Sequence, residues 1–236
     1  MLSKCSSPPI NTLVSFHLLN LTHTITSSTI NMENLFRSPR LIYRAIEDTP
    51  EDEAFIHSIQ SDIVAFANSD TGLLVPMTKA ESKKYKHKLV EKALLAAIIC
   101  LAPPLSSPAS ATPPVPIGCI SLKGVDPSQA RHRNTFISID ITAPYQRKGY
   151  GSEAIEWVLD WGFRIGGLHR IGIECFSFND GAKQLYERLG FVYEGAQREA
   201  LWFNGGWHDY VTFGMLEGEW KARQEKTLLE KVTKKD

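Results

Sequence analysis

The stretch QRKGYGSEA, residues 146–154, decides how the rest of the chain can be interpreted. It places two glycines, Gly149 and Gly151, beside two cations, Arg147 and Lys148, where the sequence indicates that a strand passes into a helix. Backbone N–H groups at the start of a helix attract anions, and glycine lets a ligand approach the backbone without obstruction by a Cβ atom. The spacing is neither G-x-G-x-x-G nor that of a P-loop. By itself the stretch predicts either a phosphate site or a tight turn with solvated cations.

The hydrophobic pattern on both sides predicts the order strand, helices, three strands, helix, strand, helix and two strands. Helix caps are expected at Asp48 or Thr49, followed by Pro50, and at Asn179. The last two strands are expected to form a hairpin around Asn204-Gly205-Gly206. The strands are expected at 40–46, 94–102, 117–125, 135–143, 170–178 and within 199–216, and the main helices at 47–62, 78–94, 152–165 and 179–190.

Composition excludes several classes of protein. Lysine plus arginine and aspartate plus glutamate both number 26, so no global field directs the chain to nucleic acid or to an anionic membrane. The four cysteines are far apart in the sequence, which predicts free thiols and a reducing compartment. The longest apolar run, residues 93–102, is shorter than the roughly 18 residues that a membrane span needs. No metal site is predicted.

The termini and one internal segment differ from the rest. Residues 1–36 are predicted to be a disordered extension, and translation from Met32 instead of Met1 stays open. The start is acid-poor and serine-rich, which leaves a mitochondrial presequence open, although its lack of arginine favours a cytoplasmic protein. A Pro/Ser/Ala-rich insertion is expected at 102–116 inside a domain of residues 37–220, and residues 221–236 are expected to be a charged tail.

Two motifs and both ends of the predicted domain carry a resemblance. Gln146-x-x-Gly149-x-Gly151 resembles the acyl-CoA pyrophosphate loop of the GNAT N-acetyltransferases. Some 28 residues later, Asn179, Tyr186 and Leu189-Gly190-Phe191 are similar to the second signature of that superfamily. The segments 38–46 and 194–216 resemble the two ends of the branch that contains ribosomal-protein-alanine and spermidine N-acetyltransferases. The resemblance covers roughly residues 37–218.

The resemblance implies an α/β (α+β) fold: a single GNAT-type domain with a mixed, mostly antiparallel sheet of six to seven strands, flanked by helices. The sheet is expected to splay between its fourth and fifth strands. Acetyl-CoA is the implied cosubstrate, and its pantetheine arm is expected against Ile141 and Thr142. The diphosphate and the rest of the cofactor are assigned to Gln146, Arg147, Lys148, Gly149, Tyr150, Gly151, Ser152 and Asn179.

The chemistry requires a base and an acid. An aliphatic ammonium titrates near 10, so a base must remove its proton at neutral pH. The resemblance assigns this role to Glu174, with Asp140 as the reserve, while an exposed strand carboxylate is the structural alternative for Glu174. Tyr186 is expected to protonate the leaving sulfur, or else to be a half-buried aromatic residue. Direct transfer needs no enzyme nucleophile, so Cys175 is expected to be a packing residue.

The acceptor side is less determined. Trp202, Trp207 and Asp209, with Phe203 and His208, could seat a cationic amine, or the aromatic residues could simply close the core. A protein or peptide N-terminus is the favoured acceptor, with a polyamine or another small amine as the alternative. A CoA-binding sensor or scaffold without catalysis also stays open. The basic run KKYKHK, residues 83–88, is expected to be a solvated helix face with no nucleic-acid partner, in a monomer or homodimer without a membrane partner.

Overall fold

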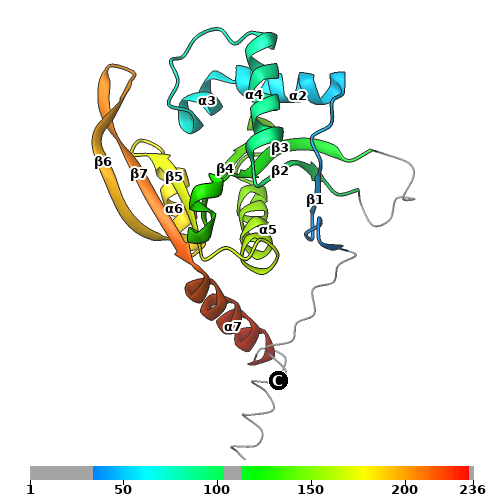
Figure 1. Cartoon of the computed structure of the whole chain (residues 1–236), viewed down its shortest axis with the longest axis vertical. Coiled ribbons are helices and arrows are strands. Elements are labelled where there is room, and N and C mark those ends of the chain that lie inside the picture. Colours follow the sequence, from blue (N-terminus) through cyan, green and yellow to red (C-terminus); the bar gives the residue numbers. More distant parts are fainter. Residues whose placement is uncertain (1–33, 104–112, 234–236) are drawn as a thin grey trace, which may run out of the picture. The chain divides into compact units, whose positions relative to one another are not determined.

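The computed structural model describes residues 34–103 and 113–233, and residues 36–224 form one compact unit. Residues 1–33 and most of the predicted insertion, 104–112, lie outside the described residues. The elements in chain order are β1 (Leu41–Arg44), α2 (Pro50–Ser61), α3 (Ile63–Ser69), α4 (Lys79–Lys92), β2 (Leu95–Leu101), β3 (Val115–Leu122), η2 (Pro127–His132), β4 (Asn134–Ile141), η3 (Ala143–Tyr145), α5 (Tyr150–Arg164), β5 (Arg170–Phe176), α6 (Asp180–Arg188), β6 (Val192–Phe203), β7 (Gly206–Leu216) and α7 (Glu217–Thr233) (Figure 1).

The strands form one seven-stranded sheet in the order β1-β2-β3-β4-β5-β7-β6. Only β4 and β5 run parallel, and their pairing covers just residues 134–137 against 170–173. Beyond this short ladder β4 continues to Ile141 and β5 to Phe176 without pairing to each other. The predicted mixed sheet with a splay between its fourth and fifth strands is confirmed.

The sheet is covered on both faces. On one face α5 buries a stripe that includes Ile155 and Leu159 against Ile120 of β3, within the main hydrophobic core. On the other face Ile56 and Ile59 of α2 form a smaller core with Cys119. Successive side chains of a strand point to opposite faces, so the neighbours Cys119 and Ile120 assign α2 and α5 to opposite sides. The open end of the sheet therefore has helices on both sides.

The α-helices α2, α3, α4 and α6 begin at a side-chain cap, whereas α5 does not. Thr49, Asp62, Thr78 and Asn179 each accept a hydrogen bond from a backbone N–H in the first turn of α2, α3, α4 and α6. This confirms the predicted caps at Thr49 and Asn179. Gly149 precedes α5 in the left-handed region, with φ of 81°, and supplies no side-chain bond. The first N–H groups of α5 therefore remain open to another partner.

Two boundaries differ from the prediction. The loop expected up to residue 116 ends earlier, because Val115 and Pro116 already pair with Leu101 and Cys100 of β2. At the other end, residues 217–233 form the helix α7, which the sequence prediction described only as a charged tail from residue 221. Buried Trp220 packs against Phe163 of α5, with ring centroids 5.4 Å apart, and so anchors the first turns of α7.

Candidate active site

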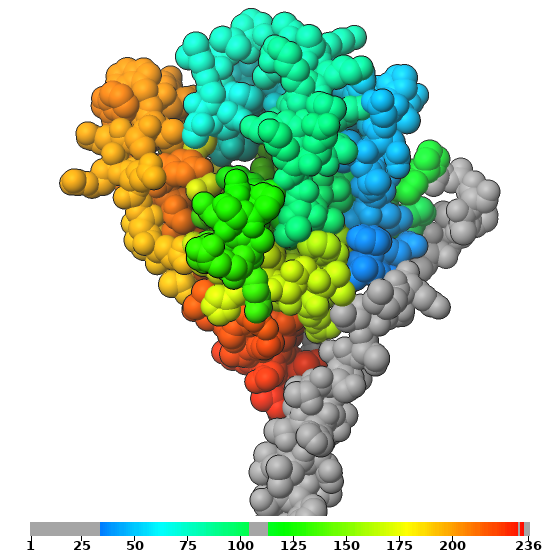
Figure 2. Space-filling view, in the orientation of Figure 1, coloured from blue at the N-terminus to red at the C-terminus, as the bar shows by residue number. Residues whose placement is uncertain are grey.

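A cleft of about 1300 Å³ lies where β4 and β5 separate. Figure 2 shows the surface hollowed between α3, the segment that precedes α5, and the β6–β7 hairpin. Segments that are far apart in the sequence contribute to its walls: α3, the C-terminal half of α4, the ends of β4 and β5, and the starts of α5 and α6. The predicted residues that line the cleft are Ile141, Gln146, Arg147, Gly149, Gly151, Ser152, Asn179, Asp140, Glu174 and Tyr186.

The loop before α5 is shaped to present its backbone. Arg147 and Gly149 both have positive φ values, 60° and 81°, so the chain turns sharply just before the uncapped helix begins. Gln146 closes the loop onto the end of β4 by donating from Nε2 to the Ile141 carbonyl oxygen over 2.8 Å. A Cβ atom at Gly151 would lie 3.9 Å from Ile141 and touch nothing closer, so this glycine leaves space above the first turn of α5. The loop has the form of an anion site.

Arg40 fastens this loop from outside, and the sequence analysis did not identify it. Its Nη1 donates to the Lys148 carbonyl oxygen over 3.0 Å, and its Nε lies 2.7 Å from Oε2 of Glu153 in the first turn of α5. The Arg40 guanidinium also lies over the ring of Tyr150, 4.7 Å from its centroid. Lys148 and Tyr150 thus hold the loop in place, and neither lines the cleft. The separation of 108 positions between Arg40 and Lys148 hides this contact from any local motif.

The end of β4 offers a backbone donor to the cleft. Thr142 does not, because its backbone N–H and its hydroxyl both donate to the Ile117 carbonyl oxygen, over 2.9 and 3.0 Å. Successive N–H groups of a strand point to opposite sides. Since that of Thr142 points to β3, that of Ile141 points away from β3, into the opening beside β5. Of the two residues assigned to a pantetheine arm, Ile141 is the one with a free amide.

Two half-buried carboxylates flank the opening on the α2–α4 side of the sheet. Asp140 pairs with Cys119, which packs against α2, and Glu174 alternates with the core residues Ile173 and Cys175. Oε2 of Glu174 accepts from Tyr210 Oη over 2.6 Å and from Lys123 Nζ over 2.9 Å. Lys123 and Tyr210 were not predicted, because nothing in the sequence relates them to Glu174.

Asp140 has a different environment. Burial raises the pKa of its carboxyl to about 6, with a hydrogen bond from Ser69 opposing the shift and the charges of Asp70 and Asp62 adding to it. Ser69 is the last residue of α3, and Asp62 and Asp70 flank this helix at its two ends. A carboxylate with a pKa near 6 can act as a base at neutral pH, so the structure leaves Asp140 in contention with Glu174.

Tyr186 reaches the opening from the other face of the sheet. It is buried among Phe191 and Phe213 in the core that contains α5, and it lines the cleft. Burial, with the nearby Cys175 and Asp140, raises the pKa of its phenol, which therefore keeps its proton at neutral pH. Burial also raises the pKa of the Cys175 thiol to about 11, so this group is an unreactive thiol at neutral pH. The two carboxylates and the phenol thus approach the opening from opposite faces.

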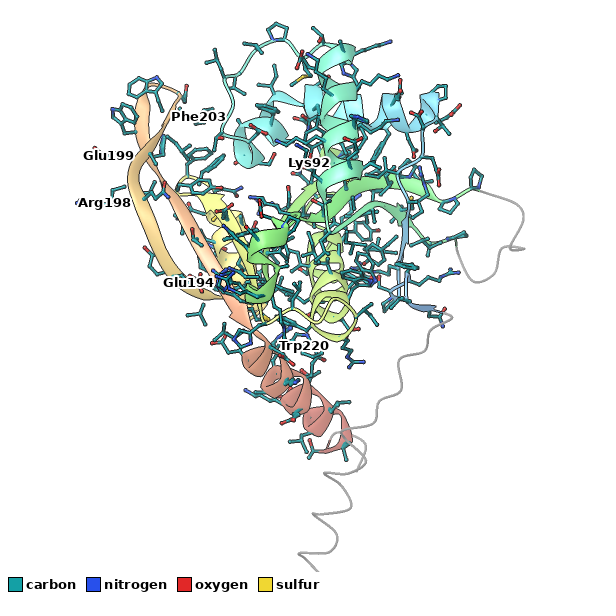
Figure 3. The ribbon with its side chains drawn as sticks, in the orientation of Figure 1. Lys92, Glu194, Arg198, Glu199, Phe203 and Trp220 are labelled. Atoms are coloured by element: carbon teal, nitrogen blue, oxygen red, sulfur yellow. The ribbon has the colours of Figure 1, made fainter. Side chains whose placement is uncertain are left out.

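The predicted acceptor residues Trp202, Trp207 and Asp209 do not line the cleft. Trp202 and Trp207 pair with each other near the end of the β6–β7 hairpin, where their exposed fractions are 62% and 59%. Oδ1 of Asp209 accepts from the Glu199 backbone N–H over 2.9 Å, at an irregularity of β6 where Glu199 has φ of 52° (Figure 3). Asp209 therefore supports the bend of the hairpin, and the predicted acceptor role of the three residues finds no support in the cleft.

The basic run at 83–88 is largely neutralised. Lys83 lies 2.9 Å from Glu53, and Lys84 lies 2.7 Å from Glu81. Buried Lys86 contacts Asp48 and Glu53, and His87 lies 3.2 Å from Glu91. Only Lys88 in this run has no carboxylate within 4.0 Å among the residues that the structure describes, and Lys88 lines the cleft.

Two kinds of feature are absent from the described residues. No three of their His, Cys, Asp or Glu side chains are grouped so as to hold a metal ion. None of the helices in residues 34–103 and 113–233 is both long and apolar enough for a membrane span.

Comparison with known proteins gives the same fold and family. Residues 80–191 match the model of the acetyltransferase (GNAT) family. The spermidine N(1)-acetyltransferase of Vibrio cholerae is 34% identical over 94 residues, which cover 40% of this chain and 54% of that protein. A Bacillus subtilis protein named as a candidate ribosomal N-acetyltransferase is 30% identical over 107 residues, covering 45% of this chain and 57% of that protein. The chain thus spans about half the length of the curated relatives that it matches.

Solved structures extend the likeness to nearly the whole fold. The crystal structure of spermidine N-acetyltransferase from Vibrio cholerae in complex with CoA and spermine superposes with a TM-score of 0.62, at 24% identity, covering 78% of this chain and 99% of that one. An acetyltransferase from Bacillus anthracis also gives 0.62, at 21% identity, covering 78% and 98%. The architecture is that of the N-acetyltransferases. The chain resembles the GNAT family in sequence over residues 80–191 and in fold over most of its length.

Proposed function

We propose that the protein is an acetyl-CoA-dependent N-acetyltransferase that moves the acetyl group directly to a primary amine. The observation that supports this most is the opening between β4 and β5, where candidate bases on one face meet a protonated tyrosine on the other. The match to the GNAT family model and the structural neighbours add support, since acetyl transfer is the chemistry for which that family is named.

The residues present fit acetyl-CoA. The uncapped start of α5, with Arg147 beside it, offers backbone N–H groups and a guanidinium to the diphosphate. The Ile141 N–H is the donor available to the pantetheine arm, and Gly151 leaves the approach open. Asn179 also lines the cleft while its side chain caps α6 by accepting from the Ala182 N–H. Bound in this way, the cofactor supplies an activated acetyl thioester.

The protein groups then handle two protons. Glu174 accepts the proton of the ammonium group through Oε1, since Tyr210 and Lys123 already occupy Oε2. The freed amine nitrogen attacks the thioester carbonyl carbon, and the bond from that carbon to sulfur breaks. Tyr186 gives its proton to the departing sulfur, so free CoA leaves as a thiol. The attacking nitrogen still carries one surplus proton and passes it to the Tyr186 phenolate, which leaves a neutral amide and restores the phenol. Asp140 is the second candidate for the base, on the strength of its raised pKa.

A peptide N-terminus is the favoured acceptor. The charged residues that line the cleft are mixed: the acids are Asp70, Asp140, Glu174 and Asp180, and the bases are Lys88, Lys92, Lys123, Arg147 and Arg188. Such a lining is a poor match for a polycation, which an excess of carboxylates would hold better. A polyamine acceptor remains the second candidate, because a relative that shares 34% identity over 94 residues is named for spermidine.

The test is an acceptor screen that measures free thiol release from acetyl-CoA in the presence of peptides, polyamines, aminoglycosides and arylamines. At least one amine should raise the release well above hydrolysis, and Glu174→Gln and Tyr186→Phe should each lower kcat by about a hundredfold while CoA still binds. Binding of CoA with no acceptor-dependent release from any class would refute the enzyme and favour a CoA sensor.

A further inference from the structure

We propose that Lys88 and Lys92 select acceptors whose amine is followed by acidic groups, and that an acidic peptide N-terminus is the substrate class. The inference rests on the proposed function, since it concerns the acceptor of the same cleft. It starts from the two lysines because, among the described α4 cations without a carboxylate within 4.0 Å, they are the ones that line the cleft.

The two lysines are set apart from their neighbours. Lys83, Lys84 and Lys86 on the same helix each contact a carboxylate within 3.0 Å. Neither Lys88 nor Lys92 has one within 4.0 Å in the part of the chain that the structure describes, and both side chains are exposed. Both also line the cleft, and Figure 3 shows Lys92 at the end of α4. The ammonium groups of Lys88 and Lys92 are therefore available to pair with a negatively charged molecule in this cleft.

The cleft separates its charges by depth. Asp140 and Glu174, the half-buried carboxylates beside the opening, provide the place for an ammonium group. Lys88 and Lys92 are exposed, so their ammonium groups stand at the rim. One rim carboxylate, Asp70, already accepts from the Gly72 N–H over 2.7 Å. A molecule with its amine inside and carboxylates outside matches this order of charges, whereas a polyamine would put further positive charge against the lysines.

The spacing of the lysines fits an extended peptide. Residues four apart on a helix lie one above the other, and the rise between them is about 6 Å. In an extended chain, side chains two residues apart share one face and are separated by about 6.6 Å. Two acidic residues at alternate positions behind the amine can therefore face Lys88 and Lys92 together.

The experiment compares C-terminally amidated peptides that differ only in charge: Ala-Glu-Gly-Glu-Gly, Ala-Gln-Gly-Gln-Gly and Ala-Arg-Gly-Arg-Gly. Wild-type kcat/KM from thiol release should fall in that order, by about tenfold between the acidic and the basic peptide at low salt. The difference should shrink as salt is added, because the lysines are exposed. Lys88→Glu/Lys92→Glu should reverse the order.

Lys79→Glu is the matched control, because Lys79 is exposed on the same helix and does not line the cleft. It should keep the wild-type order. The Kd for CoA should be the same in all variants, and a weaker Kd in the double variant would overturn the proposal by assigning the lysines to the cofactor. Acetylation of all three peptides at one rate would overturn it as well, with the enzyme intact. Absence of acetylation of every amine would instead refute the proposed function.

Discussion

Tyr210 donates its hydroxyl hydrogen to Oε2 of Glu174 over 2.6 Å. Lys123 contacts the same oxygen over 2.9 Å, so both donors hold Oε2 and leave Oε1 to another partner, in a side chain that lines the cleft. A base that is to meet an incoming amine needs a defined orientation, and these two contacts provide it.

Tyr210→Phe should lower kcat by about tenfold, the value of one hydrogen bond to a charged group. The Kd for acetyl-CoA should not change, because the Tyr210 hydroxyl is engaged with Glu174 and the cofactor is assigned to other residues. Stopped-assay kinetics with isothermal titration of CoA would measure both. Tyr193→Phe is the control, since Tyr193 is 57% exposed and does not line the cleft. Equal effects of the two substitutions would contradict a positioning role for Tyr210.

Asp140→Asn should stabilise the protein at neutral pH. The folded-state pKa of Asp140, about 6, lies above the ordinary value, so the folded protein holds the ionised carboxylate at a cost at pH 7. The cost disappears as the pH falls from 7 through 6 towards 4 and the folded state binds the proton. The gain at pH 7 has an upper bound of about 3 kcal/mol, because two pKa units correspond to about that much and Asp140 keeps some contact with water.

Urea unfolding of Asp140→Asn and wild type at pH 7 and pH 4 would measure this difference. The variant should be more stable at pH 7 and equal at pH 4. Its turnover should stay within a few fold of wild type if Glu174 is the base. A folded Asp140→Asn protein without activity would move that role to Asp140.

Gly151→Val should weaken CoA binding by about tenfold or more with little change in Tm. A Cβ atom there meets no atom closer than 3.9 Å in the folded protein but stands in the approach to the first turn of α5. Gly149→Ala, by contrast, should lower the free energy of unfolding by about 1–2 kcal/mol. Gly149 has φ of 81°, and a Cβ atom there would lie 3.2 Å from Arg40. Thermal unfolding with CoA titration separates the two effects, and an unchanged Kd in Gly151→Val would count against the cofactor site.

Cys175→Ala should keep turnover within about twofold of wild type. With a pKa near 11 the thiol is protonated at neutral pH, so it neither attacks the thioester nor carries an acetyl group. Initial-rate assays, with circular dichroism to verify the fold, are sufficient. Loss of activity in a folded variant would show that an acetyl-enzyme forms and would replace direct transfer.

The sequence was informative where the signal is local. The loop at 146–152, the Asn179 cap and the order of strands and helices were all predictable, because each depends on residues close together in the chain. The splay between β4 and β5 came from the resemblance, since no propensity indicates where a parallel ladder ends.

Contacts between residues far apart in the sequence could not be predicted from it. Arg40 meets Lys148 and Glu153, and Lys123 and Tyr210 meet Glu174, only because the sheet brings distant strands together. The position of the hairpin aromatics was hidden for a similar reason: a long hairpin carries Trp202 and Trp207 to its exposed end, and their acceptor role stays a prediction.

Gly172 of β5 pairs with Phe136 of β4 in the short parallel ladder, and the Phe136 ring packs against the glycine. A methyl group in its place would overlap that ring, since an added Cβ would come within 2.6 Å of Phe136 Cδ1. The glycine lets β4 and β5 pair closely just before they separate, so a contact two residues before Glu174 bears on the width of the opening. A substitution at Gly172 could therefore alter the width of the opening between β4 and β5 while every residue assigned to the reaction stays in place.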